Sequence, residues 1–95
     1  MSPAKQLWRK HLDAPFPTRC YGDVVLGVDL VQIDALVAGC AMSVIEEGRT
    51  IEPGHAEIME QCRAGLATAL RSLEGEEKDY FTRVDQLAEF VLSAR

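Results

Sequence analysis

The sequence predicts an all-α fold: an up-down-up three-helix bundle with a short N-terminal helix and an extended strap. Apolar residues recur at three- and four-residue spacing along three long stretches of the chain. The links around Gly48 and Gly75 are short, so consecutive helices should run antiparallel. The 95 residues are 47% hydrophobic and 26% charged, which is typical of one folded domain. Within this domain, 1–95, we assign 1–28 to the N-terminal helix and strap, and 29–95 to the bundle.

Ser2 and Pro3 predict the start of the N-terminal helix. A serine side chain accepts a hydrogen bond from the first free amides, and proline fits the first helical position. The predicted helix ends at Asp13, because Pro15 and Pro17 favour an extended path. Trp8 lies on the apolar face of this helix, opposite a basic face. It is a candidate interface residue, although packing on the bundle and anchoring at a membrane surface are alternatives.

The segment 20–28, with sequence CYGDVVLGV, has the composition of a short strand. Its apolar run is bounded by Gly22 and Gly27. No second convincing strand is present in the sequence. We therefore expect this segment either to pack on the helices as an extended strap or to pair with its copy in a dimer.

The first long helix is predicted from about Leu30 to Glu47. Asp29 followed by Gln32 fits a capping box at its start, and Gly48 supplies a left-handed stop. Between Ile33 and Ile45 this helix is apolar on most of its circumference. Such a helix is buried centrally or shared with another chain.

The second and third long helices have amphipathic patterns. The second is predicted from 50–53 to about Glu74, and the third from about Glu76 to about Ser93. Their predicted buried stripes are Ile58, Met59, Cys62, Leu66, Ala69, Leu70 and Leu73 in the second helix, and Tyr80, Phe81, Val84, Leu87, Ala88, Val91 and Leu92 in the third. Phe90 lies off its stripe. With Trp8 and Leu36 it completes the candidate interface residues, and a two-fold homodimer is the expected use of such surface.

Charge is unevenly distributed along the chain, whose net charge is −5. Residues 1–28 carry four basic and two acidic groups, whereas 29–95 carry six basic and thirteen acidic groups. An acidic body disfavours nucleic acid and steers a basic protein partner toward itself. Capture of a basic toxin by an immunity or antitoxin protein would be one such case. No uncharged apolar stretch is long enough to predict a membrane span.

Asp34 is the most unusual residue of the first long helix. On a helical wheel it falls among Leu30, Val37 and Ala38 rather than on the polar strip. A carboxylate there must find a partner or stay protonated. One interpretation is a buried acid for ligand binding or catalysis, and the other is a structural ion pair with Arg19 or Arg9.

A second candidate site combines cysteine, histidine and methionine. His55, Met59 and Cys62 recur on one face of the second long helix, and Cys40 should lie opposite in the antiparallel hairpin. Thiolate and thioether ligands select soft metal ions such as copper(I), but the same residues could simply fill the core. His55 could also act as a general base or a pH switch, or cover the end of the core as a neutral ring.

The remaining sequence features define the expected class of protein. Cys20, Cys40 and Cys62 are odd in number and have no CxxC spacing, so we expect neither a disulfide framework nor structural zinc, and a reducing, cytoplasmic compartment. No catalytic or nucleotide-binding motif is present, and no cofactor is expected. The sequence therefore predicts a non-catalytic, homodimeric helical interaction module. The alternative is a small-ligand or soft-metal binder that uses Asp34 and the cysteine, histidine and methionine cluster.

Overall fold

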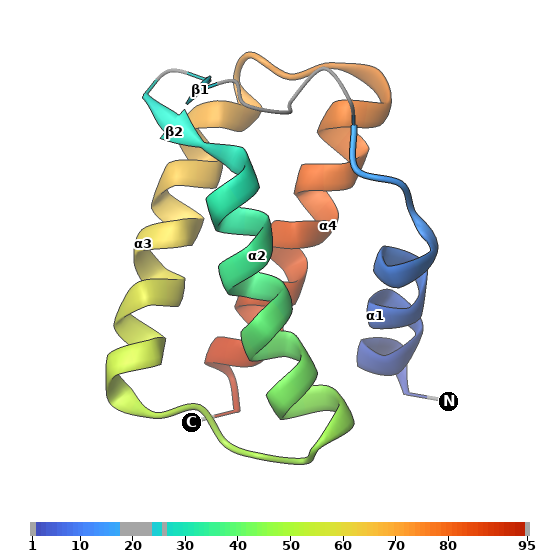
Figure 1. Ribbon diagram of the computed structural model, residues 1–95, viewed down its shortest axis with the longest axis vertical. Helices are drawn as coiled ribbons and strands as arrows, with labels where there is room; N and C mark the ends of the chain where they lie inside the picture. Colours follow the sequence, from blue (N-terminus) through green and yellow to red (C-terminus); the bar gives the residue numbers. More distant parts are fainter. Residues whose placement is uncertain (1, 18–23, 26, 95) are drawn as a thin grey trace.

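Four packed helices make up most of the protein in a computed structural model that describes residues 2–17, 24–25 and 27–94. They are α1 (Pro3–Asp13), α2 (Leu30–Ala41), α3 (Pro53–Leu70) and α4 (Gly75–Leu92), and α2 continues into a π-helical turn, η2 (Met42–Glu46). The all-α prediction is confirmed. In Figure 1, α2 and α4 run downward and α3, which follows α2 in the sequence, runs upward. The N-terminal helix α1 lies beside α4.

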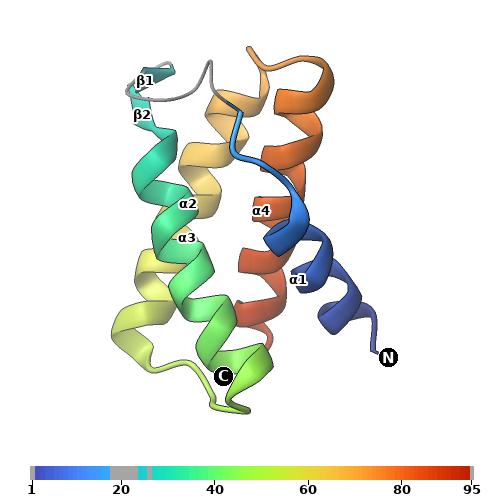
Figure 2. The same ribbon diagram turned by 45° about the vertical axis from the view of Figure 1, so that its right-hand side comes forward.

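The N-terminal helix begins as predicted. Ser2 Oγ accepts a hydrogen bond from the Lys5 amide at 3.2 Å, and Pro3 occupies the first helical position. Trp8 and His11 are buried against the bundle. The prediction that Trp8 contributes to a partner interface is therefore wrong, because its indole is part of this chain's own core. In both views α1 lies alongside α4 (Figure 2).

A minimal antiparallel hairpin precedes α2. Its strands are β1 (Val24–Val25) and β2 (Val28–Asp29), and the turn contains Gly27 with a φ of 81°. The valines predicted as a strand thus pair within the chain, whereas we expected no second strand. Residues 18–23 and 26, which include Arg19, Cys20 and much of the predicted strand, lie outside the described residues.

The start of α2 follows the predicted cap. Asp29 Oδ1 accepts a hydrogen bond from the Gln32 amide at 3.1 Å. At the other end the hydrogen-bond pattern widens, since the Glu47 amide donates to the Met42 carbonyl at 3.2 Å across five residues. Gly48, with a φ of 69°, then ends the helical segment.

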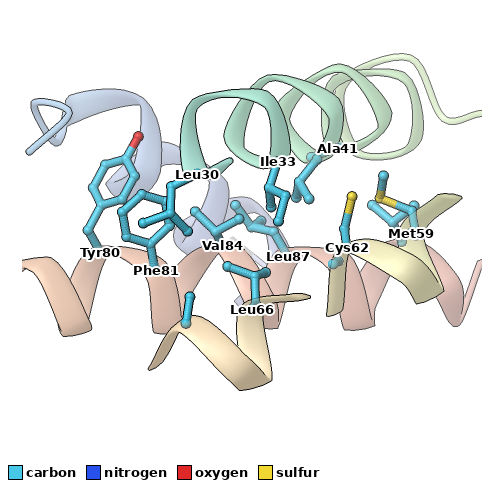
Figure 3. Close-up of a cluster of buried hydrophobic side chains, with 14 of the residues drawn as sticks. Leu30, Ile33, Ala41, Met59, Cys62, Leu66, Tyr80, Phe81, Val84 and Leu87 are labelled. Atoms are coloured by element: carbon cyan, nitrogen blue, oxygen red, sulfur yellow. The ribbon is translucent and has the colours of Figure 1, made fainter. Parts of the chain in front are cut away.

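The core lies where α2, α3 and α4 face one another (Figure 3). The predicted stripe of α4 is confirmed for Tyr80 to Val91, and Leu92 is partly buried. The α3 stripe is wrong at Ile58, which is exposed, and Ala56 is buried in addition. Gly65 permits close approach of α2, because a β-carbon there would lie 3.2 Å from Ile33 Cδ1.

The link between α3 and α4 differs from the prediction. The α3 helix ends at Leu70 rather than near Glu74, and Leu73 packs into the core after the turn. Gly75 is the first residue of α4 and has a φ of 61°. Within the described part of the chain, no helix is both long enough and apolar enough to cross a membrane.

Candidate functional site

Asp34 joins three helices in a small polar cluster inside the bundle. Its Oδ2 accepts a hydrogen bond from the Tyr80 hydroxyl at 3.1 Å, and its Oδ1 lies 3.1 Å from Nε2 of His11. Tyr80 and His11 are buried, while the side chain of Asp34 is 20% exposed. The cluster thus ties α1 and α4 to the first turns of α2.

The contact between His11 and Asp34 is close but has no well-aligned hydrogen bond. The two atoms are close, yet Asp34 Oδ1 and His11 Nδ1 both lack a hydrogen-bond partner. The ring of His11 is instead held by aromatic contacts, with its centroid 5.9 Å from Trp8 and 5.0 Å from Tyr80. The geometry is that of a structural anchor for α1, since His11 and Asp34 are joined by no third histidine, cysteine or acidic side chain of the described residues.

This arrangement bears on the predicted partner of Asp34. Among the described residues of the N-terminal segment, the one that contacts Asp34 is His11 and not Arg9. Arg9 is exposed, and Arg19 lies outside the described residues. The signal for His11 was present in the sequence, because it shares a face with Trp8 three residues earlier. The helical periodicity predicts that Tyr80 lies in the core, but it does not indicate that the hydroxyl reaches Asp34.

The cysteine, histidine and methionine candidates lie in different environments. Met59 and Cys62 are buried, Cys40 is half-buried and His55 is exposed. Figure 3 shows the sulfur atoms of Met59 and Cys62 directed toward α2, inside the core. Burial raises the pKa of the Cys62 thiol, and the nearby Cys40 raises it further. Burial also raises the pKa of the Cys40 thiol. Both shifts favour the protonated thiol over the metal-binding thiolate.

His55 fails to reach the core because it belongs to the first turn of α3. Although it shares a helical face with Met59 and Cys62, it lies at the open end of that face. There it lines a hollow of about 330 Å³ together with Leu36 and Cys40. In the part of the chain that the structure describes, no group of three or more histidine, cysteine or acidic side chains could hold a metal ion.

The outward face of α2 exposes apolar side chains where a solvated helix usually has charged ones. Leu36 is 38% exposed and Met42, at the start of η2, is 47% exposed. From the start of α2 to Ile45 this exposed surface carries no charged side chain. Its residues are Val31, Gln32, Ala35, Leu36, Gly39, Met42 and the half-buried Ser43. We call this set the uncharged face of α2.

The uncharged face has an internal symmetry about Gly39. A β-carbon at Gly39 would meet nothing within 4 Å, so its backbone is open to an approaching surface. Ala35 and Ser43 lie four residues before and after it, and Leu36 and Met42 lie three residues before and after it. These small residues line the hollow of about 330 Å³ with Leu36 on one side, and the lining also includes Arg49, Glu52 and His55.

Phe90 is the other predicted interface residue that the structure leaves exposed, at 38%. It belongs to the last turns of α4, and no other large apolar side chain of that helix is comparably exposed in the described residues. No protein-family model matches the chain, and neither a curated protein nor a solved structure matches it.

Proposed function

We propose that the protein is a non-catalytic helical interaction module that forms a two-fold homodimer through the uncharged face of α2. The observation that carries this proposal is an exposed helical surface, about three turns long, without a single charge. Water-exposed apolar surface of this extent is unfavourable unless it is used for contact. A symmetric pair places identical surfaces against each other, so the surface must be self-complementary.

The arrangement about Gly39 supports a second copy as the occupant. Across a two-fold axis near Gly39, Leu36 or Met42 of each protomer can enter the hollow that small residues line in its partner. A basic partner would find no carboxylate on this face. Two copies would also bring no like charges together at the centre of the contact, although each chain carries a net charge of −5.

Sedimentation equilibrium of the full chain tests the dimer. We expect twice the chain mass of 10.5 kDa at micromolar concentration. Leu36→Glu and Met42→Glu should each return the mass to that of one chain, with an unchanged circular dichroism spectrum because both positions are exposed. Leu12→Glu is the matched control, since Leu12 is 54% exposed on α1 and should leave the dimer intact.

Two results would overturn this assignment. One is a single-chain mass for the unaltered protein over the whole concentration range. The other is dissociation by Phe90→Glu but not by Leu36→Glu, which would move the interface to α4.

We further propose that the dimer captures a basic protein partner. Its support is the excess of acidic groups in 29–95 and the exposure of carboxylates on two helices. Exposed acidic residues include Glu52, Glu57, Glu74, Glu76 and Asp79. Complementary charge accelerates association and makes it sensitive to ionic strength.

Affinity capture at two salt concentrations tests the partner's chemistry. We expect a co-purifying protein with a basic isoelectric point, recovered less well as ionic strength rises. Recovery of an acidic protein, or of one whose yield does not depend on salt, would contradict the proposal.

A further inference from the structure

We propose that a hollow between α1 and α4 binds a small molecule carrying a phosphate group, through Arg83, Arg9 and Lys10. The hollow has a volume of about 550 Å³. It is shallow and widely open to solvent, so a ligand would bind at the surface. Its lining comprises Gln6, Arg9, Lys10, Asp13, Ala14 and Arg83.

Positive charge is concentrated in this hollow, although the protein as a whole is acidic. Three of its lining residues are cationic and one, Asp13, is acidic. In the described part of the molecule, none of the three cations forms an ion pair. Arg63 shows the contrasting case, because it contacts Asp85 at 2.9 Å and Glu89 at 3.0 Å. The cations of the hollow thus remain available to an anion.

Arg83 provides the second observation. Its Nε is buried and has no hydrogen-bond partner. A buried donor without an acceptor is unfavourable, and a charged donor more so. The guanidinium carbon also lies 5.9 Å from the centroid of the Tyr80 ring, which Asp34 holds in place through the hydroxyl. Arg83 is therefore positioned before any ligand arrives. The buried Nε is closed to a ligand, so the terminal guanidinium nitrogens are the donors that a phosphate could reach.

The chemistry of the lining favours phosphate. A guanidinium donates in a planar fork that matches phosphate oxygens, and a lysine ammonium adds a compact charge. A dianion also uses the excess of two positive charges better than a single carboxylate does. A neighbouring groove shares Lys10 and Arg83, but its wall includes carboxylates of α4. The carboxylates that line it are Glu74, Glu76, Glu77 and Asp79. Because these carboxylates repel an anion, a phosphate would bind on the side of the hollow that Gln6 and Arg9 line.

Titration of the ¹⁵N-labelled full chain with inorganic phosphate, at constant ionic strength, tests the site by nuclear magnetic resonance. We expect saturable shifts of the amides around Arg9, Lys10 and Arg83, and no saturable shifts with acetate. Arg83→Gln should weaken binding at least about tenfold, the amount one charge-assisted hydrogen bond contributes. Arg71→Gln is the matched control, because it removes the same charge from an exposed position at the end of α3.

A second variant protects the test against a folding defect in Arg83→Gln. Arg9 and Lys10 are exposed, so the double variant Arg9→Gln, Lys10→Gln should fold normally and lose binding to a similar extent. Equal phosphate binding by this double variant and by Arg71→Gln would overturn the proposal. So would shifts that never saturate, or that acetate reproduces.

Discussion

Helices α2 and α4 differ in how much of their apolar surface the bundle covers. Apart from Phe90, the apolar residues of α4 form one stripe, and that stripe is buried except for the partly buried Leu92. The apolar residues of α2 surround the helix, so one side enters the core and the other remains the uncharged face. In α4 the sequence pattern is accounted for by contacts within one chain. In α2 the apolar pattern extends beyond the contacts within one chain, and this exposed remainder is the surface on which the dimer proposal rests.

The sharpest test of this comparison uses the two phenylalanines of α4. Phe81→Ala should lower the free energy of unfolding by about 3–5 kcal/mol, because its fully buried ring leaves a cavity. Phe90→Ala should change it by less than about 0.5 kcal/mol, as expected for an exposed position. Urea unfolding of both variants measures the difference. Similar losses would mean that the periodicity of α4 does not report burial.

The polar contact on the inner side of α2 should have a smaller effect. Asp34→Asn removes the charge that faces His11 and should cost about 1–2 kcal/mol at pH 7. This is less than the about 3–5 kcal/mol for a fully buried pair, because a fifth of the side chain reaches water. Asp79→Asn, at an exposed position of α4, is the control for loss of charge. A neutral or stabilising effect of Asp34→Asn would show that the cluster does not hold α1 in place.

The cap of α2 tests whether this helix depends on local signals in addition to packing. Asp29→Ala removes the acceptor of the Gln32 amide and should cost about 0.5–2 kcal/mol in urea unfolding. Thr50→Ala, at an exposed position outside the helices, should leave the midpoint unchanged. An unchanged midpoint in Asp29→Ala would mean that packing alone fixes the start of α2.

The smallest expected effect is a pH dependence from Cys62, on the face of α3 that packs toward α2. Burial and Cys40 raise the pKa of this thiol in the folded protein above its ordinary value of 9.0. Folding therefore favours the protonated thiol. The resulting stability is fully present below the unfolded pKa and is lost as pH rises through the folded pKa. Unfolding free energies from pH 7 to 10 should fall more steeply for the unaltered chain than for Cys62→Ala. Parallel curves would contradict the shift.

The sequence predicted burial and exposure best for helices with one apolar face that packs against the rest of the bundle. The Asp29 cap, the stripe of α4 and the exposure of Leu36 and Phe90 are all found as predicted. Helical periodicity was misleading at the ends of helices. His55 lies on the same side of α3 as the buried residues, but it belongs to the first turn, where that side extends beyond the core. The sequence places His11 on the same face of α1 as Trp8, but it does not show that this face meets Asp34, because that depends on how α1 packs on the bundle. Opposite charge favoured an arginine as the predicted partner of Asp34, whereas the packing of α1 places His11 beside it.

The π-helical turn at the end of α2 has a consequence for how this chain tolerates changes in length. In a π-helical turn each amide donates its hydrogen bond to the carbonyl five residues earlier, as Glu47 does to Met42. Each hydrogen-bonded turn therefore contains one residue more than a turn of α-helix. Deleting one residue within Met42–Glu46 can therefore be absorbed by closing the turn to ordinary α-helical geometry. The same deletion within Leu30–Ala41 would rotate everything after it by about 100° about the helix axis and carry Val37 or Ala41 out of the core. Natural length variation, where it occurs in this helix, should thus be confined to its last turn.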